Sequence, residues 1–141
     1  MRLTAFTDFG LRALMRLAGE PDRSFTTDEI ASEFAISRHH LVKVVRRLAE
    51  AGYVRTQRGA GGGFALARPA GAITLGEVVR DLEEDQPLVE CFRADGGSCV
   101  LTPRCRLKKK LAAAREAFLK ELDATSLADC AYSPPPRRTL A

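Results

Sequence analysis

Apolar side chains recur at the spacing of an amphipathic helix in two segments near the beginning of the chain. The first segment, residues 7–18, is expected to begin at Thr7, whose side chain can cap free amide groups of the first turn. The second segment, residues 26–34, opens with Thr26 and Glu29, which have the spacing of a capping box. The pattern therefore predicts two helices joined by a short loop.

A third amphipathic segment, residues 37–51, follows almost immediately. Ser37 can cap its beginning, and Gly52 directly after it suits a left-handed C-terminal cap. Its apolar positions share one side of the helix, while basic residues and histidines occupy the rest. Two short helices joined by a tight turn, the second of them basic, are typical of a helix-turn-helix whose second helix reads DNA.

The next residues predict a β-hairpin. Two short runs with strand propensity flank a glycine-rich turn at residues 58–63. Such a glycine-rich run can also bind the phosphate of a nucleotide, but no Lys-Ser/Thr pair follows Gly63, and the dinucleotide-binding spacing is missing. We therefore expect a mainly α fold with a small β-hairpin, in which residues 1–70 form a winged helix-turn-helix. An ordinary helical bundle is the alternative.

Residues 71–132 are expected to form a second region. Thr74 and Glu77 predict another capping box, and a cysteine-bearing loop follows. A helix of about 20 residues is then expected to begin at Thr102-Pro103 and to reach Ala124. One side of this helix carries an apolar stripe that consists of Leu107, Leu111, Ala114, Phe118 and Leu122.

This stripe favours a dimer seam, because little of its own domain is left to cover it. A helix folded back on the winged region is the alternative. Residues 126–132 predict a last helical turn, and the proline-rich residues 133–141 predict a disordered tail.

Positive charge is concentrated in the first half of the chain. The formal net charge is +4, and residues 1–70 carry 11 Lys and Arg against 7 Asp and Glu. Within residues 37–68, seven basic residues face one acid, Glu50. This excess favours double-stranded DNA as a partner, whereas a solvated basic surface is the alternative. The residues expected to contact DNA are Thr27, Ser37, Arg38, His39, His40, Lys43, Arg46, Arg58, Gly61 and Gly62.

Three of the four cysteines lie within fifteen residues, at Cys91, Cys99 and Cys105. No export signal or membrane-spanning run is recognisable, so a cytoplasmic location is expected, where disulfides are disfavoured. Metal binding and redox chemistry are then the remaining roles for the clustered cysteines. The absence of a Cys-x2-Cys pair argues against structural zinc, while separated thiolates on a loop suit an iron–sulfur cluster. Incidental thiols are the alternative, and Cys130 is interpreted as a small buried residue.

Cys105 is expected in the first turn of the long helix, where free amide groups lower the pKa of a thiol and stabilise an anionic cluster. Catalysis is not expected, because the two histidines, His39 and His40, lie on the presumed DNA face without a matching catalytic set. A zinc-binding interaction module is a further alternative.

Four segments together resemble the nitric-oxide-sensing repressors of the Rrf2 family of bacterial winged-helix regulators. They are residues 4–14, 37–45, 58–64 and 99–107. The resemblance implies a homodimer on a palindromic operator, with nitric oxide as the signal. A regulator that answers cluster supply or oxidants is the alternative within the same family.

The resemblance also implies the ligands of a 4Fe–4S or 2Fe–2S cluster, namely Cys91, Cys99, Cys105 and, from the other subunit, Asp8. Without the resemblance, Asp8 is a charge favoured at a helix N-terminus. Arg12, one turn further on, can pair with Asp8 when the cluster is absent. The gap between Cys91 and Cys99 is longer than the family pattern predicts, which affects loop geometry more than ligand identity.

Overall fold

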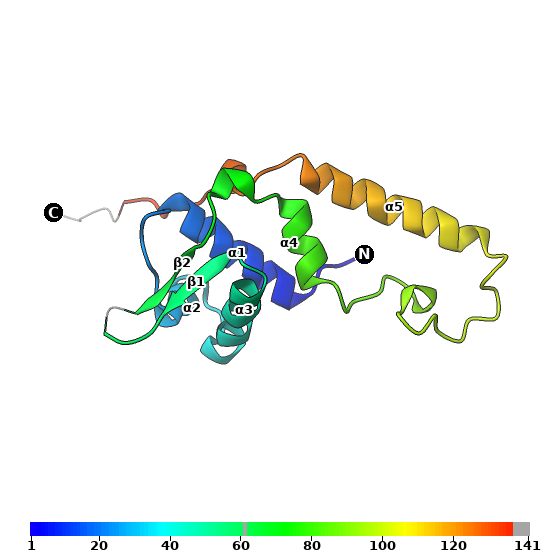
Figure 1. The fold of residues 1–141 in the computed structure, drawn as a ribbon, viewed down its shortest axis with the longest axis horizontal. Helices are drawn as coiled ribbons and strands as arrows, with labels where there is room; N and C mark the ends of the chain where they lie inside the picture. The colour runs from blue at the N-terminus through cyan, green and yellow to red at the C-terminus, as the bar shows by residue number, and fades with distance from the viewer. Residues whose placement is uncertain (61, 137–141) are drawn as a thin grey trace.

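The computed structural model describes residues 1–60 and 62–136, and its ribbon is shown in Figure 1. The described residues form five α-helices and one antiparallel hairpin, so the predicted fold class is confirmed. The main elements are α1 (Ala5–Gly19), α2 (Thr27–Phe34), α3 (Arg38–Glu50), β1 (Val54–Gln57), β2 (Gly63–Leu66), α4 (Leu75–Leu82) and α5 (Arg106–Asp123).

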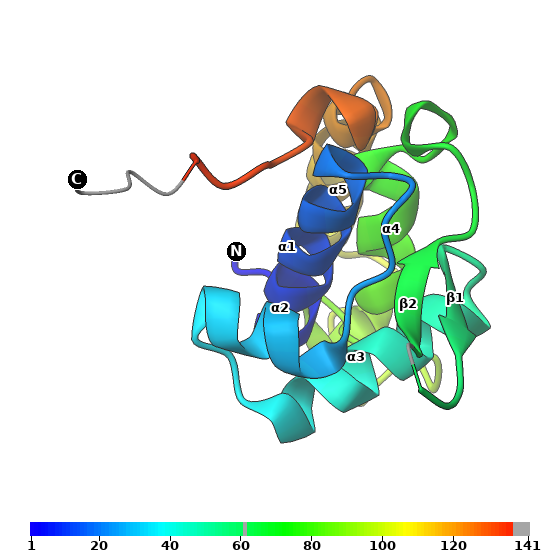
Figure 2. The same cartoon turned by 90° about the vertical axis from the view of Figure 1, so that its left-hand side faces the viewer.

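Helices α1 to α4 and the hairpin surround one apolar core, with α1 in the middle (Figure 2). Leu14 of α1, Leu41 and Leu48 of α3 and Val78 of α4 are fully buried in it. Gly10 permits the close approach of α4, because a Cβ at this position would lie 2.7 Å from the Leu82 side chain. The first four helices and the hairpin therefore pack as one unit.

The helix-turn-helix begins and ends where its local signals predict. Thr26 and Glu29 form both halves of the capping box at the start of α2. Ala35 adopts a left-handed conformation with φ of 53° and ends this helix. Ser37 then caps α3, and Gly52 follows α3 with a φ of 85°. The caps at Ala35 and Ser37 fix the tight turn between α2 and α3.

The prediction for the first helix was wrong at its beginning. Thr4, not Thr7, is the N-cap, and the Thr7 amide donates to the Thr4 hydroxyl at 3.2 Å. Thr7 lies inside α1 and is fully buried. The Thr4 hydroxyl and amide are themselves held by the carboxylate of Glu83, which explains the choice of cap.

The hairpin is tied to the loop before α2. Phe25 and Phe64 exchange two backbone hydrogen bonds of 2.8 Å, so the loop extends the small sheet at one point. Gly63 is required there, because a Cβ would lie 2.4 Å from the Phe25 carbonyl oxygen. The wing is thereby held against the helices.

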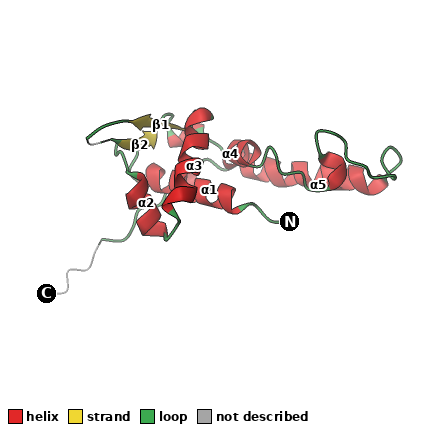
Figure 3. Ribbon diagram, turned by 90° about the horizontal axis from the view of Figure 1, so that it is seen from below, coloured by secondary structure: helices red, strands yellow, loops and turns green. Residues whose placement is uncertain are grey.

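Helix α5 extends away from this unit along the long axis of the molecule (Figures 1 and 3). It contacts α4, where Leu119 is buried. The predicted beginning of α5 was wrong, because the helix starts at Arg106 and Cys105 is its N-cap. Residues 101–104 form turns instead. Its end at Asp123 lies one residue before the predicted end.

One further prediction for the second half needs correction. Thr74 caps α4 through the amide of Glu77, but the capping box is not closed, because the Glu77 carboxylate lies 2.8 Å from the guanidinium of Arg68. Residues 133–136 of the predicted tail have no regular secondary structure, and the Ser133 hydroxyl donates to the Gly19 carbonyl at 3.1 Å. Residues 137–141 lie outside the described residues. The predicted last turn is present as a short 3-10 helix, Ala128–Cys130.

Candidate nucleic-acid interface and cysteine loop

Helix α3 has one buried and one exposed side. The buried side consists of Leu41, Val44, Val45 and Leu48. The exposed side presents Arg38, His39, Lys43 and Arg46. The residues predicted to contact DNA thus share this helix, the first turn of α2 with Thr27, and the hairpin. This is the arrangement in which a recognition helix can enter a major groove.

Two of the cations on this surface have acidic partners that the sequence reasoning missed. Arg38 donates to Asp28 at 2.6 Å, and Arg46 donates to Glu50 at 3.2 Å. All four side chains are more than half exposed, so each pair contributes little to stability. Both arginines can therefore exchange the carboxylate for a phosphate at low cost. Spacing of four residues was a usable signal for the pair within α3.

The remaining predicted DNA contacts differ in their surroundings. His40 packs edge-on against Phe9 of α1, with ring centroids 5.9 Å apart. The Ser37 hydroxyl accepts from the His40 amide at 3.4 Å and serves as the N-cap. Lys43 forms no ion pair with any residue in the described part of the chain. Its ammonium group is therefore the most available cation on α3.

The wing presents Arg58 at an exposed position beside the turn. Gly59 has a φ of 95°, and the Gly62 amide donates to its carbonyl at 2.9 Å, which closes the turn. A Cβ on Gly62 would lie 2.6 Å from the Gln57 carbonyl oxygen. Gly61, also predicted to contact DNA, lies outside the described residues.

The clustered cysteines lie on the segment between α4 and α5. Cys91 is in the short 3-10 helix Glu90–Phe92, Cys99 follows in irregular chain, and Cys105 caps α5. Within residues 1–60 and 62–136, all cysteines are free and half-buried. Among these same residues, no three His, Cys, Asp or Glu side chains converge closely enough to bind a metal ion. The predicted ligands are therefore not brought together within the single chain.

The donor chemistry nevertheless fits an iron–sulfur cluster. Three soft thiols without disulfides lie on a segment with little regular structure. The Cys105 sulfur accepts from the Lys108 amide at 3.4 Å, so it lies at the positive end of α5, where a bound anionic cluster would be favoured.

The long gap between the first two cysteines forms a closed loop. The Glu90 carboxylate accepts from the Ser98 amide at 2.9 Å and from the Ser98 hydroxyl at 2.8 Å. These bonds hold the pKa of the Glu90 carboxyl below its ordinary value. Cys91 and Cys99 directly follow the two residues that are joined. The longer spacing thus does not separate the two thiols by the full length of the loop.

Asp8, the predicted fourth ligand, lies in the first turn of α1. Its carboxylate accepts two bonds from Arg12, at 3.1 and 2.6 Å, and both side chains are nearly half exposed. The expected pairing of these two residues is confirmed. The bonds are exposed and one turn apart, so the carboxylate can leave Arg12 for another partner.

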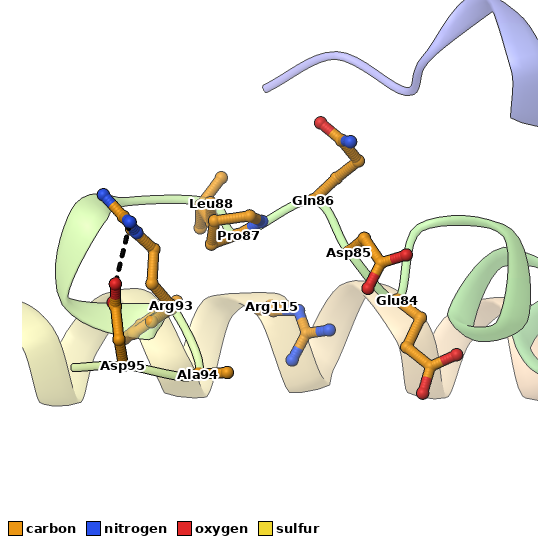
Figure 4. A pocket seen from close by; sticks show the side chains of 10 residues that line it. Glu84, Asp85, Gln86, Pro87, Leu88, Arg93, Ala94, Asp95 and Arg115 are labelled. Carbon is orange, nitrogen blue, oxygen red and sulfur yellow. Dashed lines mark hydrogen bonds and ion pairs between the residues drawn. The ribbon is translucent and has the colours of Figure 1, made fainter. Parts of the chain in front are cut away.

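An open pocket of about 410 Å³ lies between the segment after α4 and the side of α5 (Figure 4). Arg115 of α5 lines the pocket, and Arg93 pairs with Asp95 at 2.8 Å. Charged side chains of both signs line the pocket, and the described residues around it include no cysteine. The pocket is therefore separate from the predicted cluster ligands.

The apolar stripe predicted on α5 is only partly covered within the chain. Leu107 is 63% exposed and Ala114 is exposed, whereas Leu111, Phe118 and Leu122 are half-buried. Leu119, outside the stripe, makes the buried contact of α5 instead. The C-terminal part of α5 therefore packs on the winged unit, while Leu107 and Ala114 stay exposed, so both interpretations of the stripe remain open. No helix in the described ranges has the length and apolar character needed to cross a membrane.

Comparison with known proteins agrees with this architecture. A family model described as Rrf2, iron-dependent transcriptional regulator, matches residues 3–133. The HTH-type transcriptional regulator NsrR of Geobacillus kaustophilus (strain HTA426) is 48% identical over 130 residues, which cover 92% of this chain and 88% of that protein.

Two solved structures show the same fold. CymR (YrzC), the global cysteine regulator of B. subtilis, is 30% identical with a TM-score of 0.73, over 93% of this chain and 96% of that one. IscR of T. potens is 25% identical with a TM-score of 0.70, over 92% and 85% of the two chains. Because the family model spans nearly the whole sequence, this chain belongs to the Rrf2 family and is a transcriptional regulator rather than an enzyme.

Proposed function

We propose that this regulator is a dimeric repressor that binds a palindromic operator and releases it when nitric oxide attacks an iron–sulfur cluster. The observation that carries this proposal is the group of three free thiols on the segment between α4 and α5. The 48% identity to an NsrR regulator and the resemblance to nitric-oxide-sensing repressors support it. Such a protein acts in the cytoplasm, where its operator is.

DNA binding is assigned to α3 and the wing. Lys43 and Arg58 are exposed and supply phosphate contacts, while Arg38 and Arg46 exchange their acidic partners for phosphates. His39 and the polar first turn of α3 are placed to reach base edges. The glycines at the wing tip let its backbone approach a neighbouring groove.

Dimerisation is assigned to the partly exposed apolar stripe of α5. A symmetric pair of stripes buries the same apolar side chains on both subunits. A two-fold dimer presents two recognition helices, which is the reason for expecting a palindromic site.

Cys91, Cys99 and Cys105 are the residues that would hold the cluster through their thiolates. Asp8 would be the fourth ligand, supplied by the other subunit after its carboxylate leaves Arg12. When bound, the group supplies iron that a diatomic ligand can attack at the carboxylate-held position. Because Asp8 lies in α1 at the centre of the DNA-binding unit, its release or capture changes how that unit is held.

The test is anaerobic purification followed by a visible spectrum, an iron count and a nitric oxide titration with labelled operator. We expect bleaching and operator release in the same titration. Cys91→Ala, Cys99→Ala and Cys105→Ala should each fold without a stable cluster. Release that proceeds equally in the triple variant would exclude these cysteines as the sensor. A colourless protein with equimolar zinc would support the zinc-binding alternative.

A second candidate is a sensor of oxidants or of cluster supply. It is favoured by the fold shared with CymR, the global cysteine regulator of B. subtilis, and with IscR. Operator release by peroxide at concentrations where nitric oxide has no effect would support this candidate over the first.

A further inference from the structure

The C-terminal end of α4 carries acidic side chains that the proposed DNA-binding and cluster-binding sites do not use. One of them, Glu83, is the C-cap of α4. Its carboxylate accepts from the amide and from the hydroxyl of Thr4, both at 2.8 Å. Since Thr4 is the N-cap of α1, Glu83 fixes the beginning of that helix.

The same end of α4 also holds the recognition helix and the wing. Arg47, in the last turn of α3, donates to the Asp81 carbonyl at 3.0 Å and to the Glu84 carboxylate at 3.3 Å. Tyr53, directly before β1, donates its hydroxyl to the Asp81 carboxylate. Three elements of the winged unit are therefore bonded to one short stretch of chain, which we name the α4 junction (Asp81, Glu83 and Glu84).

The hydrogen bond between Tyr53 and Asp81 involves a side chain of the buried core. The Tyr53 side chain is 1% exposed, and Arg68 lies over its ring with the guanidinium carbon 5.7 Å from the centroid. Burial, with the bond to Asp81, raises the pKa of Tyr53 above its ordinary value, so the phenol remains a hydrogen-bond donor. A buried donor that lost this acceptor would be left unsatisfied, so the bond resists breaking.

The segment that carries Cys91 and the segment that carries Asp8 are both connected to this junction. The chain leaves Glu84 and reaches Cys91 seven residues later. Thr4 precedes Asp8 by one turn, and its carbonyl accepts from the Asp8 amide at 3.0 Å. A displacement of the segment after Glu84 therefore acts first on Glu84 and Asp81, which hold Arg47 and Tyr53. A displacement of Thr4 acts on Glu83, which lies between Asp81 and Glu84.

We propose that the α4 junction positions the recognition helix and wing, and that it transmits the state of the cysteine segment to them through Arg47 and Tyr53. The transmission of the cluster state rests on the proposed function, whereas the positioning of the recognition helix and wing does not. Arg47 and Tyr53 are positioning residues in this proposal, since neither is assigned a contact with DNA.

The first experiment uses the full chain without a cluster. The variant Arg47→Gln/Tyr53→Phe replaces the guanidinium by a shorter, neutral amide, removes the phenol hydroxyl and keeps the aromatic ring. Tyr132→Phe is the matched control for loss of a phenol elsewhere. We expect faster amide hydrogen exchange in residues 47–57 and about fivefold weaker operator binding in the double variant, with neither change in the control. Unchanged exchange in residues 47–57 of a folded double variant overturns the proposal. If the double variant does not fold, Arg47→Gln alone carries the same expectation.

The second experiment compares the operator Kd of cluster-loaded and cluster-free protein. We expect a ratio of about tenfold or more in the wild type and less than about twofold in the double variant. A wild-type ratio retained in the double variant refutes transmission through the junction. A wild-type ratio of one, with the exchange result as expected, refutes the proposed function and leaves the positioning role standing.

Discussion

Removing the charge of Lys43 tests whether α3 and the wing meet DNA as a phosphate-binding surface. Four of the exposed cations there are predicted DNA contacts, namely Arg38, Lys43, Arg46 and Arg58. Each neutralised phosphate contributes about −0.9 to the slope of log K against log salt, so eight contacts in a dimer give roughly −7. If Arg38 and Arg46 stay with their acidic partners, four contacts remain and the slope is roughly −4.

The assay is fluorescence anisotropy of a labelled operator duplex over a fourfold range of salt. The wild-type affinity should fall by roughly 10² to 10⁴ over that range. Lys43→Ala removes two contacts per dimer and should make the slope shallower by about 2. Lys109→Ala, an exposed cation on α5, should leave the slope unchanged. A wild-type slope near zero, or equal effects of the two substitutions, would refute the assignment of this surface to DNA.

Four further predictions concern assembly, helix capping, acid stability and the fourth cysteine. Leu111→Asp should give a monomer in sedimentation, while Ala113→Asp on the opposite side should stay dimeric; a dimer in both would place the seam elsewhere. Thr26→Ala should lower the free energy of unfolding by about 1 kcal/mol in denaturant titrations. The hydrogen bond from the Thr26 amide lowers the pKa of Glu29. The charged carboxylate therefore contributes stability above pH 4.5, and this contribution is lost as the pH falls through the lowered pKa. Glu29→Gln should flatten the dependence of the unfolding free energy on pH in this acid range. Cys130→Ala should keep its iron count, and loss of iron would add this residue to the ligands.

The sequence predicts the helix-turn-helix well because its signals are local. Thr26 and Glu29 satisfy each other within one turn, and Ser37 caps α3 from the adjacent position. The hairpin follows from strand propensity around a glycine-rich turn. None of these features needs information from distant parts of the chain.

The predictions were wrong where a distant residue or a competing turn determines where a helix begins. Thr4 and Thr7 are both suitable caps, and Thr4 is selected by Glu83, 79 residues away. At α5, Thr102-Pro103 has a good local signal, but the Thr102 amide already donates to the Cys99 carbonyl in a preceding turn. The helix therefore begins only after that turn, at the sulfur cap of Cys105.

The residues of the candidate site were likewise predictable only where their signal is local. The exposed cations of α3 follow from helical periodicity, whereas the ion pair of Arg38 with Asp28 joins two helices across the turn and has no signal in the spacing. The cysteine ligands could be proposed from their clustering, but their convergence within one chain could not be, and the described residues do not show it. A ligand supplied by a second subunit is one physical reason for an incomplete set in a single chain.

The packing of α4 limits how a signal from the cysteine segment can travel. Leu82 is buried against Gly10, so α4 and α1 share the apolar core and are costly to separate. The contacts of Arg47 with Asp81 and Glu84 are polar and partly exposed, so they can be exchanged for water at low cost. A movement of the segment that begins after α4 is therefore expected to alter the polar contacts of α3 before it disturbs the core. For this reason a change in DNA affinity without loss of helix content is the expected behaviour, and loss of the α1 to α4 core on cluster removal would argue for folding rather than repositioning as the switch.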